Sequence, residues 1–155
     1  MELSYSYEYG NLPAVKREGI VELEAALRAM PGSMNEDEAE RAFNTHYFAP
    51  GVYGRKMTVP AGMCIVGKIH KYDHMIVILS GVVKVVSEHQ SETLVGPHIF
   101  IAKAGSKRAI YTIEDTVWLN VHSNPGDSED IKQLESDIIA ETYEEFDQLN
   151  LEREV

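Results

Sequence analysis

The sequence predicts a mainly β protein, an antiparallel sandwich or barrel with helices towards both ends of the chain. Between Pro50 and His122, turn signals of Gly, Pro and Asx residues recur between short segments rich in Val, Ile, Thr and aromatic residues. No helical pattern interrupts these segments, whereas apolar residues recur at helical spacing before and after them. Strands without intervening helices exclude a βαβ architecture and favour two antiparallel sheets around one core.

Residues 1–49 are predicted to form an arm followed by two helices. Three tyrosines alternate within residues 5–9, a pattern that suits an added edge strand or an arm laid over a neighbour. Apolar residues then recur at helical spacing until Pro31 ends the first helix. Asn35 is the expected N-cap of a short second helix, with Glu38 as its third residue.

Residues 50–123 are predicted to form the barrel, as eight strands joined by turns. The turn Pro60-Ala61-Gly62 before one pair of strands is echoed by Lys103-Ala104-Gly105 before another. Two similar β-units folded over each other would build a jelly roll. The expected strands are 53–59, 63–70, 74–79, 82–88, 92–95, 98–103, 108–113 and 116–122.

Residues 124–155 are predicted to form an acidic helix, and all three regions are expected to make one structural domain. Residues 126–155 contain eleven Asp and Glu against one Lys and one Arg, which is −9 of the total net charge of −11. A solvated helix face explains this charge most simply. A docking surface for a basic partner is the alternative.

Composition excludes several classes of partner and site. The net charge of −11 disfavours nucleic acid, and no segment has the roughly 20 apolar residues that span a bilayer. The first residues lack the features of a signal peptide, so the protein is expected in the cytoplasm, which for a viral protein is that of the host. The single cysteine, Cys64, excludes an internal disulfide and is expected to be buried.

The candidate site lies between Pro60 and Gly81. His70 and His74 stand at the facing ends of two predicted strands joined by a tight turn. Their imidazoles can therefore point at one position in space. Alternation along the first of these strands puts Lys68 on the same face as His70.

This stretch resembles the first motif of the cupin superfamily, G-x5-H-x-H-x3-4-E-x6-G. With Gly62 and Gly81 at the two glycine positions, the family's histidine positions hold Lys68 and His70, and its glutamate position holds His74. The spacing therefore matches better than the ligand identities do.

The second cupin motif, G-x5-P-x-G-x2-H-x3-N, is similar to the stretch around Gly105. Lys103 replaces its proline and Arg108 its histidine, while Gly96 lies one residue too far upstream. The resemblance covers about residues 50–123. The whole-chain pattern, which ends in EDTVWLNVH and an acidic helix, also resembles small cupin proteins encoded by tailed bacteriophages.

The resemblance implies a double-stranded β-helix, the cupin jelly-roll barrel, with its pocket inside. It implies no particular reaction, because this scaffold hosts dioxygenases, isomerases, lyases and plain sugar-binding or sensor modules. It also implies a homodimer, since cupin barrels tend to pair through sheet edges and N-terminal arms, and unpaired strand edges need a cover.

His70 and His74 are candidate ligands of a divalent transition metal such as Fe, Zn, Ni or Mn, through neutral imidazole nitrogens. Two ligands do not complete a metal site. Lys68 and Arg108 occupy the other ligand positions of the family, and their positive charges would repel a metal at close range. A pocket in which the histidines only form hydrogen bonds is therefore the alternative.

His122 is the candidate third metal ligand, and His98 is a second candidate. His122 alternates with polar and aromatic residues on the last predicted strand. The more apolar set on that strand is Val117, Leu119 and Val121, which competes for the interior of the barrel.

Lys68 and Arg108, with Tyr111 or Tyr53 nearby, would suit an anionic small molecule such as a carboxylate, a phosphate or a nucleotide sugar. His70 and Tyr111 could act as the base and the acid of a sugar epimerase. Arg108 could instead form a salt bridge at the rim with an acidic side chain of the following turn.

Three functions follow from these features. The first is a small-molecule binding protein of phage type, possessing a pocket of two histidines and basic residues that a metal would assist. The second is a metal-dependent cupin enzyme, a dioxygenase, isomerase or lyase, acting on a small polar or anionic substrate. The third is a structural accessory of a virion.

Overall fold

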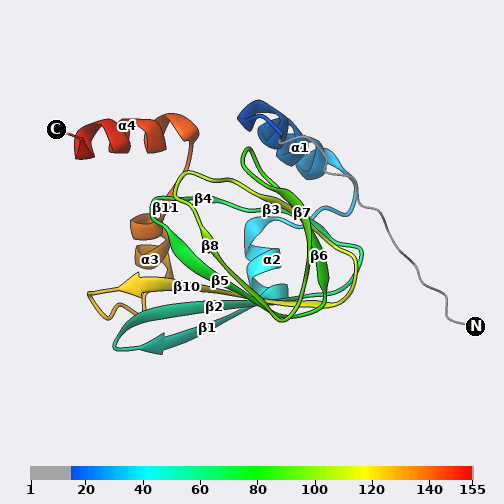
Figure 1. The fold of residues 1–155 in the computed structure, drawn as a ribbon, viewed down its shortest axis with the longest axis horizontal. Coiled ribbons are helices and arrows are strands. Elements are labelled where there is room, and N and C mark those ends of the chain that lie inside the picture. Colours follow the sequence, from blue (N-terminus) through cyan, green and yellow to red (C-terminus); the bar gives the residue numbers. More distant parts are fainter. Residues whose placement is uncertain (1–14, 155) are drawn as a thin grey trace, which may run out of the picture.

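The computed structural model describes residues 15–154, in which two β-sheets enclose the middle of the molecule and helices lie at both ends of the chain (Figure 1). The tyrosines predicted to form an arm, within residues 5–9, lie outside the described residues.

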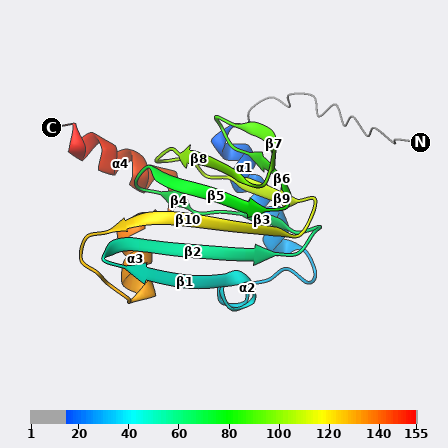
Figure 2. The same cartoon turned by 60° about the horizontal axis from the view of Figure 1, so that its bottom comes forward.

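The larger sheet has five strands that lie side by side in the order β1-β2-β10-β5-β8 (Figure 2). The second sheet has the order β3-β9-β6-β7, and β4 pairs with β11 in a small third sheet. All of these pairs are antiparallel. The strands are β1 (Asn44–Ala49), β2 (Gly51–Val59), β3 (Cys64–Val66), β4 (Ile69–His70), β5 (His74–Ser80), β6 (Val82–Val86), β7 (Ser91–Val95), β8 (His98–Ala102), β9 (Ala109–Thr112), β10 (Thr116–Asn124) and β11 (Ile139–Ala140).

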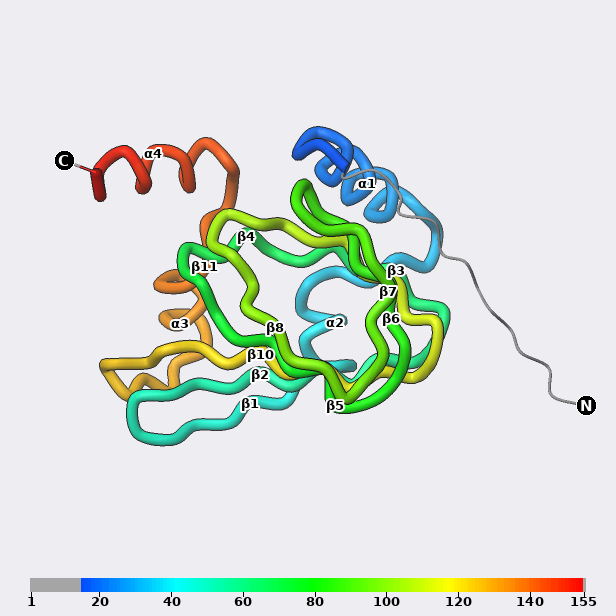
Figure 3. The backbone as a smooth tube through the Cα atoms, in the orientation of Figure 1, coloured from blue at the N-terminus to red at the C-terminus, as the bar shows by residue number. Residues whose placement is uncertain are grey.

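The strand pairs are nested, and this nesting identifies the fold. β6 pairs with β7, β5 with β8, β3 with β9 and β2 with β10. The chain is therefore one long antiparallel hairpin rolled up so that successive pairs fall in alternate sheets, which is a jelly roll or double-stranded β-helix. The tube in Figure 3 follows this path. The predicted mainly β fold with two sheets and flanking helices is confirmed.

The main core fills the space between the two sheets. Alternate residues of each strand point inward, so β5 contributes Ile76 and Ile78, and β6 contributes Val83 and Val85. Trp118 of β10 closes one side of this cluster, with its ring edge-on to Phe100. One end of the barrel is thus packed with apolar side chains.

Four helices flank the barrel within residues 15–154, and none of them is long and apolar enough to cross a membrane. Asn35 caps α2, and Asn35 and Glu38 form a reciprocal capping box as predicted. The helices are α1 (Arg17–Ala29), α2 (Glu36–Phe43), α3 (Ile131–Ile138) and α4 (Tyr143–Arg153).

Two parts of the chain differ from the sequence-based expectation. The acidic segment is two helices, α3 and α4, separated by the short strand β11. The region before the barrel ends in a strand, β1, which extends the larger sheet beyond β2. β11 forms because it pairs with the distant strand β4, and β1 forms as a hairpin with the adjacent strand β2. Helical periodicity encodes neither pairing.

The predicted strand 63–70 is divided into β3 and β4. The backbone N–H of Gly67 donates to the carbonyl of Arg108 at this break. Strict alternation is lost there, because Ile69 and His70 are neighbours and both are buried. Cys64 is exposed, so its expected burial is wrong.

Gly105 supplies a test of how the C-terminal helix is seated on the barrel. Its φ is +77°, its N–H donates to the carbonyl of His70 at 2.9 Å, and a Cβ there would lie 2.3 Å from the ring of Phe146. We expect Gly105→Ala to destabilise the protein by about 1–3 kcal/mol more than Gly62→Ala. Gly62 is the matched control, since its φ is +83° and a Cβ there meets nothing within 4 Å.

Urea unfolding of both variants measures this difference. Equal losses of stability in the two variants would contradict the close packing of α4 against the loop that holds His70.

Candidate metal centre

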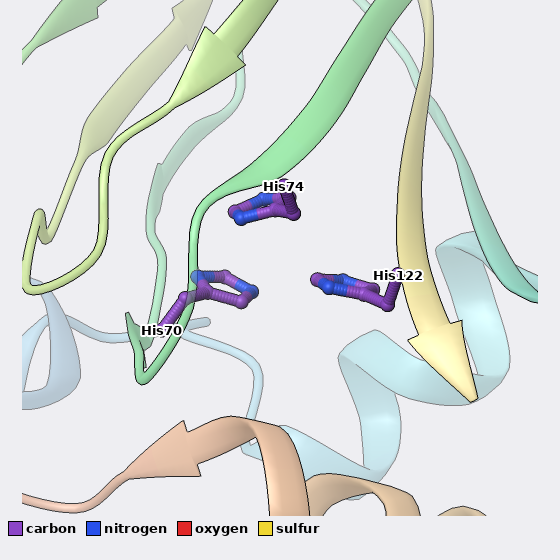
Figure 4. Close-up of side chains that lie close together, drawn as sticks. All are labelled: His70, His74 and His122. Atoms are coloured by element: carbon purple, nitrogen blue, oxygen red, sulfur yellow. The ribbon is translucent and has the colours of Figure 1, made fainter. Parts of the chain in front are cut away.

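Three histidines from three strands converge inside the barrel (Figure 4). His70 ends β4, His74 begins β5, and His122 lies on β10. The ring centroids are 4.2 Å apart for His70 and His74, 4.5 Å for His74 and His122, and 5.2 Å for His70 and His122. One nitrogen from each ring can be chosen so that all three lie within 4.8 Å of one another. We call these residues the histidine cluster.

Each member of the histidine cluster is held by a different backbone feature. His74 shares the inward face of β5 with Ile76 and Ile78. His122 shares the inward face of β10 with Trp118, while the apolar set that competed for this face points outward. His70 is positioned by the C-terminal strand β11, which pairs with β4 and places Ile139 opposite His70.

The second candidate for a third ligand does not join the histidine cluster. His98 is exposed at the start of β8, where its ring lies beside Phe100. His122 is only 6% exposed, like His70 at 7% and His74 at 5%.

All three imidazoles are neutral near pH 7. Burial lowers the pKa of His74 to about 4 and that of His122 to about 3. Burial, followed by the charge of His74 and Arg55, lowers the pKa of His70 well below its usual range. A neutral imidazole has a lone pair on one ring nitrogen, so each ring can act as a metal ligand without first losing a proton.

One hydrogen bond assigns a tautomer within the histidine cluster. The Oδ1 of Asn120 accepts from Nε1 of Trp118 at 3.2 Å and lies 3.3 Å from Nε2 of His74. A carbonyl oxygen only accepts, so Nε2 of His74 carries the hydrogen and Nδ1 carries the lone pair. Metal-binding histidines are commonly oriented through their other ring nitrogen in this way.

The remaining nitrogens are poorly satisfied. Both ring nitrogens of His70 and Nδ1 of His74 are buried and have no hydrogen-bond partner among residues 15–154. A buried polar group without a partner costs about 1–3 kcal/mol. A metal shared by these rings would pair Nδ1 of His74 and one of the two His70 nitrogens and so would remove most of that cost, and imidazole nitrogens suit Zn, Cu, Fe and Ni. The donor set therefore fits a transition metal.

The cavity beside the histidine cluster has a volume of about 10 Å³. This is about the space that one water molecule needs. It is lined by His70 and His122 together with Tyr53, Arg55, Glu135, Ile138 and Ile139. A cavity of this size accepts an ion or a very small molecule, and a sugar would require the walls to move.

The end of α3 and strand β11 close this cavity. Ile138 and Ile139 pack with Leu134 against the ring of Tyr53. The amide of Lys71 donates to the carbonyl of Ile138 at 2.7 Å. The C-terminal segment, which sequence analysis treated as a solvated acidic helix, thus forms one wall of the site.

Of the predicted basic residues, Arg108 lies close to the histidine cluster. Its charge lowers the pKa of both His70 and His74, and burial lowers the pKa of Arg108 itself to about 10. Its Nε is buried without a hydrogen-bond partner within the described chain. The guanidinium lies 6.0 Å from the ring centre of Phe100. It has no ion pair with any acid in residues 15–154, so the alternative of a rim salt bridge is not observed.

The structure does not bring Lys68 and Tyr111 into the histidine cluster. Lys68 forms ion pairs with Glu36 at 3.2 Å and with Glu135 at 3.3 Å. Tyr111 is 46% exposed on β9, between two buried residues, so alternation puts it on the outer face of the barrel. An epimerase that uses Tyr111 with His70 is therefore not supported by this geometry.

Sequence analysis missed Arg55 and Asn120. Arg55 lies on the inward face of β2 next to Tyr53, its Nε is buried without a partner among the described residues, and it stands 4.0 Å from Glu135. Alternation from Tyr53 along β2 would have found it. Asn120 could have been found from its alternation with His122 on β10.

Tyr53, the alternative to Tyr111, does contact the histidine cluster. Its ring stacks on His122 with centroids 5.9 Å apart, and its hydroxyl lies 2.8 Å from Nδ1 of His46. The other ring nitrogen of His46 bonds Glu40. Burial raises the pKa of Tyr53 to about 12, so it stays a neutral phenol. Hydrogen bonds thus connect Glu40 to His46 and His46 to Tyr53, and the ring of Tyr53 packs against His122.

No protein-family model matches the chain, and no curated protein matches it. Solved structures with a related fold include KdgF from Halomonas sp., with 14% identity, a TM-score of 0.46 and coverage of 56% of this chain and 79% of that one. A cupin-2 domain protein from Shewanella frigidimarina has 11% identity, a TM-score of 0.43 and coverage of 59% and 94%. A cupin superfamily protein from Desulfitobacterium hafniense has 14% identity, a TM-score of 0.44 and coverage of 63% and 85%.

These likenesses are too distant to carry an argument about family or function. The jelly roll is established by the strand pairing of this chain itself. The phage resemblance gains no support from the comparisons.

Chelator-treated protein is expected to lose stability progressively as the pH falls from about 6.5 to about 3. The unfolded chain protonates its histidines near pH 6.5, whereas burial lowers the pKa of His74 to about 4 and of His122 to about 3 in the folded protein. Above the unfolded pKa the histidines are neutral in both states and cost no stability. Between the unfolded and the folded pKa the unfolded state binds more protons than the folded state, so the free energy of unfolding falls as the pH falls.

Urea unfolding at a series of pH values, followed by Trp118 fluorescence, measures this loss. His122→Asn should flatten the pH dependence, whereas the exposed control His89→Gln should leave it unchanged. Identical pH profiles for wild type and His122→Asn would contradict the lowered pKa.

Proposed function

We propose that the protein binds a divalent transition metal through His70, His74 and His122 and uses this centre, together with Arg108, to bind a small anionic molecule. The observation that carries the proposal is the set of buried imidazole nitrogens without hydrogen-bond partners among residues 15–154. Proteins seldom leave several such groups together unless a ligand satisfies them. Three neutral imidazoles from three strands are a donor set that Zn, Fe, Ni and Cu favour.

A bound anion would explain why two cations lie so close to the histidine cluster. Arg55 and Arg108 would repel a metal ion, yet each has a buried Nε without a partner in the described residues. An anion bound beside the metal would offset this repulsion and would accept hydrogen bonds from a guanidinium. A carboxylate is the anion class that guanidinium geometry matches well.

A small ligand agrees with the size of the cavity. A volume of about 10 Å³ is filled by a single ion, so an anion beside the metal requires α3 and β11 to move aside, and the smallest carboxylates, formate and acetate, require the least movement. The nucleotide sugars considered from the sequence are correspondingly disfavoured.

A metal-dependent enzyme acting on a small polar or anionic substrate is the second candidate. Three protein ligands leave coordination positions open, as in catalytic metal sites, whereas structural sites are closed by four. A metal bound there would act as a Lewis acid on a coordinated oxygen. Arg55, which lines the cavity, and Arg108, which lies near the histidine cluster, would orient the substrate, and the apolar wall of Ile138 and Ile139 would exclude water.

Metal content tests the first part of the proposal. Protein purified without a chelating tag should contain about one transition-metal ion per chain, and His122→Ala should weaken binding by more than about 100-fold, since losing only an outer-sphere partner costs 10–100-fold. Elemental analysis and a competitive chelator titration measure this. His98→Ala is the control, because His98 lies outside the histidine cluster.

Equal metal contents in His122→Ala and His98→Ala would refute the centre. So would the absence of metal from wild-type protein after supplementation with Zn, Fe, Ni and Mn.

Anion binding tests the second part. Formate and acetate should raise the melting temperature of the metal-loaded protein and perturb the spectrum of its Co²⁺ form, and Arg108→Met should abolish both effects because it removes the guanidinium. Lys68→Met and Tyr111→Phe are matched controls outside the histidine cluster and should keep both effects. If Lys68→Met abolished them instead, the pocket would be wrongly located.

The same samples separate the binder from the enzyme. A binder releases the added molecule unchanged, whereas an enzyme converts it, which mass spectrometry of the recovered ligand distinguishes.

A further inference from the structure

The larger sheet is apolar on both faces. Its inner face packs against the barrel core, whereas its outer face points away from the core. We call this face the outer sheet face and define it by the outward residues of its five strands. Among these residues the only charged side chain is that of Lys56, within the described chain. The outward residues are Thr45, Tyr47 and Ala49 of β1, Val52, Gly54, Lys56 and Thr58 of β2, Val117, Leu119, Val121 and Ser123 of β10, Met75, Val77 and Leu79 of β5, and Ile99 and Ile101 of β8.

The register aligns these apolar side chains into continuous rows across the sheet. One row runs from Tyr47 through Gly54, Val121 and Met75 to Ile101. A parallel row brings Leu119, Val77 and Ile99 next to one another. Neighbouring side chains on one face of a sheet are close enough to form a single apolar surface.

This pattern differs from that of a sheet with one face in water. Such a strand alternates between apolar and polar residues. The strand β5 instead reads Met-Ile-Val-Ile-Leu from Met75 to Leu79, and β8 reads Ile-Phe-Ile from Ile99 to Ile101. Continuous apolar runs are characteristic of strands that are covered on both faces.

The described helices do not provide the second cover. In Figure 2 the five strands face the viewer, and no described helix crosses in front of them. Six large side chains of the face are exposed together, whereas monomeric proteins seldom expose large side chains as one contiguous apolar patch. They are Tyr47, Val52, Met75, Leu79, Ile99 and Ile101.

The size and charge of the outer sheet face point to its occupant. Five strands about 4.8 Å apart and roughly seven residues long make a face of about 500 Å² in plan. Two copies packed together would remove about 1,000 Å² from water, which is near the lower limit of a specific interface. Residues 1–14 are the longer of the two segments outside the described residues. A single extended segment has the width of one strand and would cover about a fifth of the outer sheet face.

Charge argues against a membrane. The chain carries a net charge of −11, and anionic lipid surfaces attract basic segments rather than acidic ones. Of that charge, −9 belongs to residues 126–155, none of which is an outward residue of the sheet. Two copies can therefore meet through this face without bringing carboxylates together.

We propose that two copies of the chain pack their outer sheet faces against each other around a two-fold axis, making a homodimer whose barrels remain separate. Sheets that pack face to face do so with side chains interdigitated, and β-branched rows such as Val77 and Ile99 suit this packing. The same patch on both subunits makes the contact self-complementary. This interface involves a sheet face rather than the strand edges suggested by the sequence.

The test is a matched pair of substitutions in the full-length protein. Ile99→Glu places a charge on the outer sheet face, and Val95→Glu places one on β7 of the other sheet. The two residues are 62% and 61% exposed and both lie on edge strands, so each substitution leaves the barrel core intact.

Sedimentation velocity over micromolar concentrations measures the association. Wild type and Val95→Glu should sediment at twice the chain mass of 17.4 kDa. Ile99→Glu should weaken dimerisation by more than about 100-fold, because dimerisation would then bury an unpaired carboxylate from each copy in an apolar interface. Far-UV circular dichroism should show that both variants stay folded.

Two outcomes would overturn the proposal. One is a wild-type protein that is monomeric throughout, which would assign the outer sheet face to a different occupant. The other is a dimer that Ile99→Glu and Val95→Glu affect equally, which would indicate pairing elsewhere.

Discussion

Strand β10 is the constraint on which the rest of the structure depends. It lies at the centre of the larger sheet, paired with β2 on one side and with β5 on the other. Its inward residues supply Trp118 to the core, Asn120 to the hydrogen bond with His74, and His122 to the histidine cluster. Its outward residues Leu119 and Val121 form the middle of the outer sheet face. One register therefore determines the core, the site and the surface at once, and a slip by one residue would exchange them.

The site combines buried imidazole nitrogens that lack hydrogen-bond partners among the described residues with two nearby guanidinium groups. Buried imidazoles without partners among the described residues are unstable alone, and so is the buried guanidinium of Arg108. A metal and an anion bound together would satisfy both, because each compensates the charge that the other introduces. In the proposed complex, the bound anion would offset the repulsion between the metal and Arg108, whereas Lys68 is paired with Glu36 and Glu135.

The acidic C-terminal segment also has a structural role in the site. Glu135 of α3 pairs with Lys68, and β11 holds His70 by pairing with β4. Ile138 and Ile139 close the cavity over Tyr53. The apolar residues of this segment thus seal the barrel, while its carboxylates neutralise the cations at the rim.

The sequence alone determined the β-rich barrel, its flanking helices and the proximity of His70 and His74. These features depend on local patterns: turn residues between alternating segments, apolar residues at helical spacing, and two histidines on either side of one turn. The position of His122 could not be decided from its own strand, because both faces of β10 carry plausible core residues.

Only the tertiary structure decided which residues join the histidine cluster. His122 enters it through the pairing of β10 with β2 and β5, and the inward face of β2 places Arg55 beside it in the cavity wall. Tyr111 is excluded by alternation on β9, and Lys68 by its ion pairs with Glu36 and Glu135. These outcomes depend on contacts between residues dozens of positions apart, and a pattern within one strand carries no information about the strand that it will face.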